Sequence, residues 1–499
     1  MSSDKHKQKR RSFDAGDLLN VRSKEVCQVP RSSSCDRTFK QSNFCRFGMI
    51  QNPTKLTEKE LHEIMIDDCQ TESEDLEKYG FGGYMPIRVS QVLGPQKEYQ
   101  ILRKIGWGQF STVWLAKHRV HSQHFAIKVI KSAKKYRIAG RDEVKILQHI
   151  RNEGRENTDG YSRIIPYYSY FNEWSINGKH KCMLFDVMGP SLLDLLMKSE
   201  FRGFYEQSAK IILKQILEGV MFLHDDCNII HTDLKPENIL IVPTQSNLNE
   251  MVAYVDRFNQ LGVQKPKSYL STLEWQEYIQ LHGEPDSTAT TLTESSSHNS
   301  SFTDDDTKMT GDIKMSSLSR RPLLFINPNI QVKIADFGNA CWENQQFSPV
   351  IQTIQYRALE VLIEAGYSFP ADMWSIGCIA FEMCTGEFLF HPKSTPNMST
   401  TEHHLGLIWE ALSEIPKDMA LSGDQSKMYF NDDGKLKKFD FGKTKIWPVE
   451  NVLIDKFRWK NKEAAVFADF INRLIEPQPE LRATAAMALD HKWVKEIED

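Results

Sequence analysis

The sequence predicts an α+β protein with two lobes, a small antiparallel β-sheet followed by a mainly α-helical region. Three short alternating runs follow one another from Tyr99 and indicate successive antiparallel strands: YQILRKIG, STVWLAKH and HFAIKVI. Residues 141–150 then carry Val144, Leu147 and Ile150 at helical spacing, which predicts an amphipathic helix. Further helical patterns lie beyond the linking stretch MLFDVMGP, at residues 192–197 and 208–224.

These patterns divide the chain into five parts. We expect the sheet lobe at residues 81–185 and the helical lobe in two pieces, 186–242 and 330–495. The residues between these pieces, 243–329, are rich in Ser, Thr, Asn and Asp, which predicts an inserted and largely disordered spacer. Residues 1–80 show little apolar periodicity and cannot bury enough apolar area to offset the entropy of ordering, so we expect a disordered tail.

The composition of the 499-residue chain argues against several classes of protein. A formal net charge of −4 gives no global basic field, so we expect no direct binding of nucleic acid. The nine cysteines include no Cys-x-x-Cys pair, which indicates neither a disulfide framework nor a zinc site and fits a reducing compartment. No uninterrupted apolar run reaches membrane-spanning length, so we expect a soluble intracellular protein that does not bind a membrane.

A glycine-containing turn between the first two strands could bind phosphate. Gly106 and Gly108 permit a tight turn whose N–H groups can approach phosphate oxygens, while Ser111 stands where a third glycine is usual. Alone, such a turn is more typical of an ordinary hairpin, but its position ahead of Lys128 favours a nucleotide site. The expected nucleotide-contacting residues are Ile105, Gly106, Gly108, Ser111, Val113, Ala126, Lys128, Phe185, Asp186 and Met188.

Lys128 lies in an apolar strand, where an unpaired ammonium group would be costly. It either reaches solvent from a surface strand or pairs with a carboxylate and a bound anion. Glu143, on the following predicted helix, is the candidate partner, and Asp142 beside it is the alternative. A Lys128–Glu143 pair would hold the lysine against the α- and β-phosphates of ATP.

The run HTDLKPEN at residues 231–238 places an acid, a cation and an amide at the spacing of a kinase catalytic loop. Asp233 would orient the substrate hydroxyl and accept its proton, and Lys235 would neutralise charge on the transferring phosphoryl group. Asn238 would offer a neutral oxygen to Mg²⁺. A surface turn could hold the same residue types, but the Asp-Phe-Gly run that follows, with Asp336 as the charged magnesium ligand, favours the kinase interpretation.

Three further residues are predicted to support the large lobe. Ala-Leu-Glu stands where kinases usually carry Ala-Pro-Glu, and its Glu360 is placed to pair with Arg482. Asp372 is expected to brace the backbone of the catalytic loop from below, as a scaffold carboxylate and not a catalytic one.

At GWGQFSTVWLAKH, HTDLKPENIL, IADFGNACW, YRALEVLIEAGYSFPADMWS and RATAAMALDHKW the chain resembles the SR-protein kinases, which phosphorylate serines in Arg-Ser repeats of splicing factors. The resemblance covers residues 80–495 apart from the spacer. It implies the two-lobed protein kinase fold, ATP and Mg²⁺ as cofactors, and Arg/Ser-rich protein substrates. Clk-like kinases share HTDLKPEN, but they lack GNACW and carry an EHLAMMERIL-type segment where this chain has EHHLGLIWEAL.

The resemblance also implies residues that dock the substrate. Glu387 and Glu410 match acidic positions that hold substrate arginines, and Lys456 matches a further residue of that groove. Arg357 matches a residue used near the substrate position that follows the target serine.

At three positions the residue differs from the one that related kinases usually have. Thr232 replaces the arginine that normally pairs with a phosphorylated activation segment, so we expect activity without phosphorylation of residues 339–357. The alternative is that Thr232 only preserves packing. His403 stands where the SR-protein kinases typically have Asp, which predicts a less acidic docking groove. Ile354 replaces an arginine that the family uses, with Arg357, near the substrate residue that follows the target serine.

These observations predict an ATP- and magnesium-dependent protein serine/threonine kinase that acts as a monomer on Arg/Ser-rich proteins. One alternative is a Clk-like dual-specificity kinase, which would also phosphorylate tyrosine. Another is an inactive scaffold that binds Arg-rich proteins, against which the four key polar groups Asp233, Lys128, Asn238 and Asp336 argue. The basic residues within 5–11 are typical of a nuclear import signal or of a solvated tail, and we expect the protein in cytoplasm and nucleus.

Overall fold

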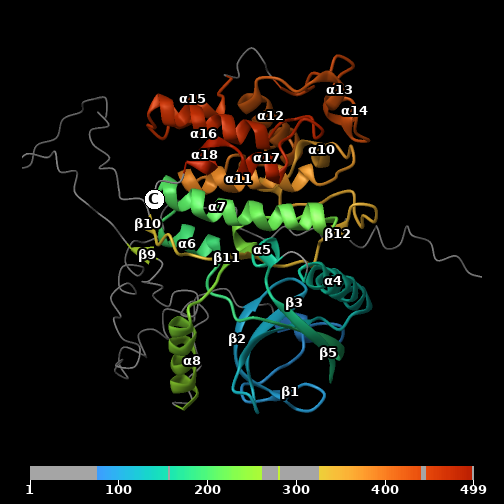
Figure 1. Ribbon diagram of the computed structural model, residues 1–499. Coiled ribbons are helices and arrows are strands. Elements are labelled where there is room, and N and C mark those ends of the chain that lie inside the picture. The colour runs from blue at the N-terminus through green and yellow to red at the C-terminus, as the bar shows by residue number, and fades with distance from the viewer. Residues whose placement is uncertain (1–75, 156–157, 261–278, 281–324, 440–445, 497–499) are drawn as a thin grey trace, which may run out of the picture.

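The structure, a computed structural model, describes residues 76–155, 158–260, 279–280, 325–439 and 446–496. Two lobes are visible in Figure 1, a β-sheet lobe in blue and a helical lobe running from green to red, as expected from the sequence. Most of the expected tail and spacer, including the basic residues within 5–11, lies outside the described residues. In the part of the chain that is described, no helix is both long and apolar enough to cross a membrane.

The N-terminal lobe is built on a six-stranded antiparallel sheet with the order β1-β2-β3-β4-β6-β5. The three predicted strands are β2, β3 and β4, and a second hairpin, β5 and β6, completes the sheet. Pairing of Val113 with Lys128, and of Ala126 with Phe185, brings predicted nucleotide-contacting residues onto neighbouring strands. The strand bounds are β1 Val92–Leu93, β2 Tyr99–Trp107, β3 Ser111–His118, β4 His124–Ile130, β5 Tyr167–Ser175 and β6 Gly178–Phe185.

Helix α4, Lys134–Glu153, packs against this sheet and is longer than the predicted helix at residues 141–150. The predicted apolar positions Val144, Leu147 and Ile150 are buried, and Glu143 is buried with them. The first two turns are rich in exposed or half-buried basic residues, so they lack the apolar periodicity by which the helix was predicted.

The C-terminal lobe is organised around α11, Pro370–Thr385, in which every residue after the proline is buried. Helix α7, Glu206–Met221, packs against it and runs on into a π-helical turn, η3, Phe222–Asp226. The remaining helices of the lobe are α5 Thr158–Tyr161, α6 Leu192–Lys198, α10 Leu359–Leu362, α12 Thr400–Leu412, α13 Lys417–Ala420, α14 Ser426–Tyr429, α15 Val449–Asp455, α16 Asn461–Leu474, α17 Ala485–Leu489 and α18 Lys492–Lys495.

Short paired strands hold the catalytic loop against the segment that follows Asp336. Strand β8, Ile239–Ile241, pairs with β11, Val332–Ile334, so the residues after Asn238 and before Asp336 are hydrogen-bonded to each other. Strand β7, Ile229–Ile230, pairs in the same way with β12, Cys341–Trp342. Two hairpin-like pairings therefore place HTDLKPEN and Asp-Phe-Gly side by side although a long insertion separates them in sequence.

We expected a largely disordered spacer at residues 243–329, but its N-terminal part forms helix α8, Gln245–Gln260. Its buried residues Met251 and Val255 pack with Leu102 and Leu115 of the N-terminal lobe, and Figure 1 shows the helix standing beside β2. The apolar positions 248, 251 and 255 have helical spacing, but the polar residues between them gave the segment a spacer-like composition. At the other end of the spacer, β9 (Ile279–Gln280) pairs with β10 (Phe325–Ile326).

Candidate active site

Lys128 lies at the centre of a network of opposite charges between the lobes. Its Nζ is 2.7 Å from Oε1 of Glu143 and 2.8 Å from Oδ1 of Asp336. This confirms the predicted Lys128–Glu143 pair, whereas the neighbouring Asp142 pairs with Lys145 at 3.4 Å. Burial alone would lower the pKa of Lys128, but the carboxylates of Asp336 and Glu143 outweigh burial and raise it. Lys128 therefore stays charged at neutral pH.

The pKa values of Asp336 and Glu143 shift in opposite directions, although Lys128 lowers both. The nearby charge of Lys128 lowers the pKa of Asp336 to about 2, against the opposing effect of burial. Burial raises the pKa of Glu143, and the pairing with Lys128 offsets only part of this. The side chain of Asp336 is 47% exposed, so its carboxylate is both ionised and accessible to a cation.

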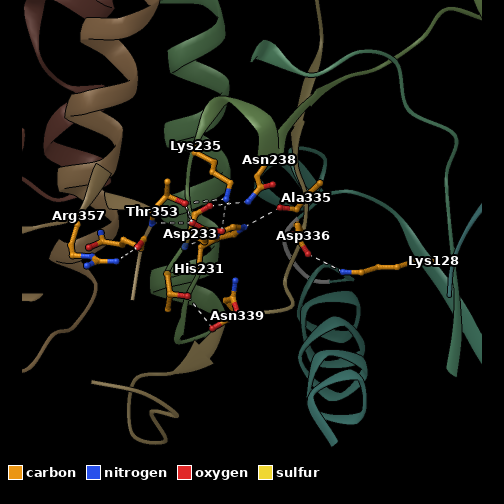
Figure 2. Close-up of polar contacts among 12 residues, drawn as sticks. Lys128, His231, Asp233, Lys235, Asn238, Ala335, Asp336, Asn339, Thr353 and Arg357 are labelled. Atoms are coloured by element: carbon orange, nitrogen blue, oxygen red, sulfur yellow. Dashed lines mark hydrogen bonds and ion pairs between the residues drawn. The ribbon is translucent and has the colours of Figure 1, made fainter. Parts of the chain in front are cut away.

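Asp233 is held by its neighbours in one orientation, as Figure 2 shows. Its Oδ2 is 2.8 Å from Nζ of Lys235, and its Oδ1 accepts a 2.8 Å hydrogen bond from the Thr353 hydroxyl. Lys235 donates a second hydrogen bond, of 3.1 Å, to the same hydroxyl oxygen. Burial would lower the pKa of Lys235, but Asp233 outweighs it and raises the pKa. The predicted acid and cation therefore lie together, with Thr353 between them.

Asn238 has only its oxygen left to offer a metal ion. Its Nδ2 donates to the carbonyl oxygen of Asp233 at 2.9 Å, which fixes the direction of the side-chain amide. Asp336 follows directly after Ala335, whose backbone N–H donates to the carbonyl of Asn238 at 2.8 Å. The two predicted metal ligands therefore flank a pair of hydrogen-bonded strands, Asn238 just before β8 and Asp336 just after β11. Within the described residues no group of three or more His, Cys, Asp or Glu could hold a metal alone.

The catalytic loop is fixed from below by Asp372, as the sequence predicted. This fully buried carboxylate accepts hydrogen bonds from the backbone N–H groups of His231 at 2.8 Å and Thr232 at 2.9 Å. It also bonds to the ring Nε2 of His224 at 3.0 Å. His231 Nδ1 accepts the backbone N–H of Asp233, so its Nε2 carries the proton and donates to Ala335 at 3.1 Å. These bonds orient the loop without touching the reacting atoms.

The predicted nucleotide-contacting residues come from four strands, the turn between β2 and β3, and the stretch that links the lobes. Ile105 and Gly106 end β2, Ser111 and Val113 begin β3, and Ala126 and Lys128 lie on β4. Gly108 is in the turn between β2 and β3, where its N–H donates to the Ser111 carbonyl at 2.8 Å. Phe185 ends β6, Asp186 accepts a hydrogen bond from the Tyr168 hydroxyl, and Met188 packs against the main core.

Thr353 is the site residue that reasoning from the sequence missed. It lies 120 residues from Asp233, yet both its backbone N–H and its hydroxyl donate to that carboxylate. No motif used in reading the sequence includes it. The signal that could have found it is its place in the segment between Asp-Phe-Gly and Ala-Leu-Glu, which must fold over the catalytic loop.

Comparison with known proteins agrees with this geometry. A family model for the protein kinase domain matches residues 99–252 and 318–494. A crystal structure of a kinase domain superimposes with a TM-score of 0.58 over 82% of this chain and 98% of the other, and at 23% identity it supports the fold.

Three relatives decide the family. Protein kinase dsk1 of Schizosaccharomyces pombe is 34% identical, with 87% of each chain covered. Serine/threonine-protein kinase SRPK of Physarum polycephalum is also 34% identical, over 86% of this chain and 93% of the relative. SRSF protein kinase 3 of Homo sapiens is 31% identical over 86% and 92%. The chain belongs to the SR-protein kinase family. It is a protein serine/threonine kinase, and protein kinases in general use ATP and Mg²⁺.

Two of the four residues that the resemblance assigned to substrate docking, Glu387 and Lys456, bond directly to each other in this kinase. Glu387 and Lys456 form an ion pair of 2.5 Å, with both side chains partly exposed. Glu410 lies on α12, and burial raises its pKa. Arg357 donates to the backbone carbonyls of Ile351 at 2.9 Å and Gln352 at 2.8 Å, so it braces the activation segment beside Asp233. Its role toward substrate stays a prediction.

The two departures from the family pattern have distinct surroundings. Nδ1 of His403 accepts the backbone N–H of Lys393 at 2.8 Å, which leaves Nε2 to carry the proton of the neutral ring. Ile354 begins the short helix η5, Ile354–Tyr356, and packs against the main core. Neither side chain supplies the charge that the family typically has at that position.

Thr232 ties the catalytic loop to the activation segment of this kinase by neutral hydrogen bonds. Its hydroxyl donates to the carbonyl of Asn339 at 2.9 Å, and its own carbonyl accepts the N–H of Gln352 at 3.0 Å. The side chain of Gln352 bonds to Ala371, Ser375 and Ala358 in the buried lobe. Both ends of residues 339–357 are therefore anchored by groups that need no phosphate.

We expect phosphatase-treated kinase to keep its activity, because these contacts hold the activation segment without an arginine–phosphate pair. The check is kcat before and after phosphatase treatment, with mass spectrometry to show that residues 339–357 carry no phosphate. Ser348→Ala, which removes the hydroxyl of a half-buried serine in that segment, should leave kcat within about twofold of wild type. Activity that appeared only after phosphorylation of a Ser or Thr in this segment would contradict the expectation.

Proposed function

We propose that this kinase transfers the γ-phosphoryl group of ATP to serine hydroxyls in Arg/Ser-rich protein segments. The observation that carries the proposal is the alignment of Asp233, Lys235 and Thr353 opposite the Lys128 ion-pair network. In this arrangement Asp233 would serve as the proton acceptor and Lys235 as a fixed cation beside it, while Lys128 would bind phosphate.

The residues present fit Mg²⁺ and ATP. Asp336 supplies an ionised carboxylate and Asn238 a directed amide oxygen, and Mg²⁺ at such sites takes its other ligands from phosphates and water. Lys128 would bind the α- and β-phosphates while Glu143 keeps its ammonium in place. Bound Mg²⁺ would neutralise charge on the phosphates during transfer.

Asp233 would accept the hydrogen bond of the substrate hydroxyl and take its proton as the oxygen attacks phosphorus. Thr353 and Lys235 keep the two carboxylate oxygens in fixed directions, so the hydroxyl does not have to displace a mobile side chain. Lys235 would balance negative charge on the transferring phosphoryl group. Thr353 is a positioning residue in this scheme because it acts through Asp233.

The preference for Arg/Ser-rich segments is supported by the relatives and by the acidic residues of the large lobe. The name SRSF protein kinase 3 indicates such substrates for that relative. Glu387 is 38% exposed, and its Lys456 partner is 43% exposed, so a substrate arginine could exchange with the lysine. A monomeric state and a distribution between cytoplasm and nucleus are further parts of the proposal, the second supported by the basic residues within 5–11.

The test compares transfer of radiolabelled phosphate to matched peptides. We expect wild-type kinase with Mg-ATP to phosphorylate an Arg-Ser repeat peptide, and to act much more slowly on the same peptide with lysine at every arginine position, because lysine cannot form bidentate pairs with carboxylates. A peptide with tyrosine in place of serine should remain unlabelled. Labelling of tyrosine would favour the Clk-like alternative, and equal rates on the arginine and lysine peptides would contradict the proposed specificity.

A further inference from the structure

A short segment before the sheet, residues 79–85, is built into the N-terminal lobe and is called here the N-terminal strap. The carbonyls of Gly82 and Gly83 accept the backbone N–H groups of Ala133 at 2.9 Å and Ser132 at 3.1 Å. These two residues directly precede α4, the helix that carries Glu143. Gly82 has a φ of +81°, and a Cβ on Gly83 would lie 1.9 Å from the carbonyl oxygen of Lys78. The strap therefore needs both glycines to follow this path.

Asn177, in the turn between β5 and β6, fixes the strap from the other side. It is buried, and its Nδ2 donates to the carbonyl of Tyr84 at 2.7 Å and to the carbonyl of Tyr79. Its own carbonyl accepts the N–H of Gly82 at 3.0 Å. Both ends of the strap are thus held by one buried side chain, whose Nδ2 group donates to both carbonyls.

The strap places the Tyr84 hydroxyl against the glycine-containing turn. Tyr84 is only 1% exposed, and its ring lies 4.2 Å from Nζ of Lys131 and 5.3 Å from the ring of Tyr79. Its hydroxyl donates a 2.6 Å hydrogen bond to the carbonyl oxygen of Gly108. The backbone N–H of Lys131 also donates to the carbonyl of Phe110 at 2.9 Å. Two carbonyls of the turn are therefore held from the side of the strap.

The bond to Gly108 fixes the direction of the next N–H group. In a planar trans peptide the C=O of Gly108 and the N–H of Gln109 point in opposite directions. Because the carbonyl points at Tyr84, the Gln109 N–H points away from the strap. A turn whose N–H groups must face phosphate oxygens needs this orientation. A turn without the Tyr84 hydrogen bond would lose more conformational entropy on binding the nucleotide.

We propose that Tyr84 is a positioning residue that presets the glycine-containing turn for the phosphates of ATP. The inference rests on the proposed function, since it takes ATP as the ligand of this turn. The inference extends the proposed function, because it assigns the segment before the sheet a role in the affinity for the nucleotide. The alternative is that the hydroxyl only satisfies a buried carbonyl and contributes to the stability of the lobe.

Tyr84→Phe separates the two roles because it removes the hydroxyl and keeps the ring against Lys131 and Tyr79. We expect the Kd for ATP to rise about three- to tenfold, the range for loss of one hydrogen bond. The Kd for adenosine, which has no phosphates, should change by less than about twofold, as should kcat at saturating ATP. Titration calorimetry on the full chain gives the two affinities, and steady-state kinetics gives KM for ATP and kcat separately.

Tyr136→Phe is the matched control. The Tyr136 ring lies 5.5 Å from Phe110 and 5.4 Å from Nζ of Lys131, but its hydroxyl has no hydrogen-bond partner among the residues that the structure describes. This variant should bind ATP and adenosine as wild type does. Equal weakening of ATP and adenosine by Tyr84→Phe, or no change in either, would overturn the inference. Wild-type kinase that bound adenosine but not Mg-ATP would instead refute the proposed function.

Discussion

Replacing Asp233 with asparagine is expected to lower kcat by about 10²–10⁴-fold, the usual contribution of a positioned general base. Asparagine has nearly the same shape and can still accept the Thr353 hydroxyl hydrogen bond, so the loop should keep its form. It cannot take the substrate proton, and it loses the ion pair with Lys235. KM for ATP should change little, because Lys128 and Asp336 hold the opposite side of the cleft.

The measurement is the initial rate of phosphate transfer to an Arg-Ser peptide for wild type and variant at equal concentration of folded protein. Asp490→Asn serves as the control, since Asp490 forms an exposed ion pair with Lys495 and such pairs contribute little. Its rate should equal that of wild type. If wild type and Asp233→Asn shared the same negligible rate, the inactive-scaffold alternative would be favoured. A variant as fast as an active wild type would remove Asp233 from the role of base.

The sequence was sufficient where chemistry restricts the choice of partner. A lysine in an apolar strand required a carboxylate, and the following predicted helix offered Glu143 as the candidate, with Asp142 as the alternative. The structure places Asp142 on a more exposed part of the same helix, paired with Lys145. Asp372 could be predicted for the same reason, because a carboxylate within an apolar helix must find donors, and the loop N–H groups supply them.

The sequence was insufficient where contact depends on how distant segments fold together. Thr353 has no local pattern that points to Asp233, and only the path of the activation segment brings them within hydrogen-bonding distance. The strap is a similar case, since a pair of glycines before a predicted sheet gives no indication that Tyr84 will reach Gly108. Helix α8 was missed because a polar composition outweighed a short apolar periodicity in the prediction.

Arg482→Ala is expected to lower the free energy of unfolding by about 3–5 kcal/mol, because it leaves a buried carboxylate without its partner. Two parallel bonds join the residues, Nη1 to Oε1 of Glu360 at 2.7 Å and Nη2 to Oε2 at 2.9 Å. The guanidinium also donates to the carbonyls of Pro370 and Glu476, each at 2.9 Å, and lies 5.1 Å from the ring of Trp374. The side chains of Arg482 and Glu360 are 0% and 2% exposed.

Urea titration followed by tryptophan fluorescence measures this loss, with Arg473→Ala as the control. Arg473 lies on α16 and pairs with Asp469 at 3.2 Å, but both side chains are about half exposed, so its removal should cost less than about 1 kcal/mol. Adding Glu360→Ala to Arg482→Ala should cost less than the sum of the single changes, since the unpaired carboxylate is then gone. Additive losses would show that the two residues stabilise the lobe independently. Arg482 does not touch the catalytic groups, so the folded fraction of Arg482→Ala should retain its kcat and fail only in stability.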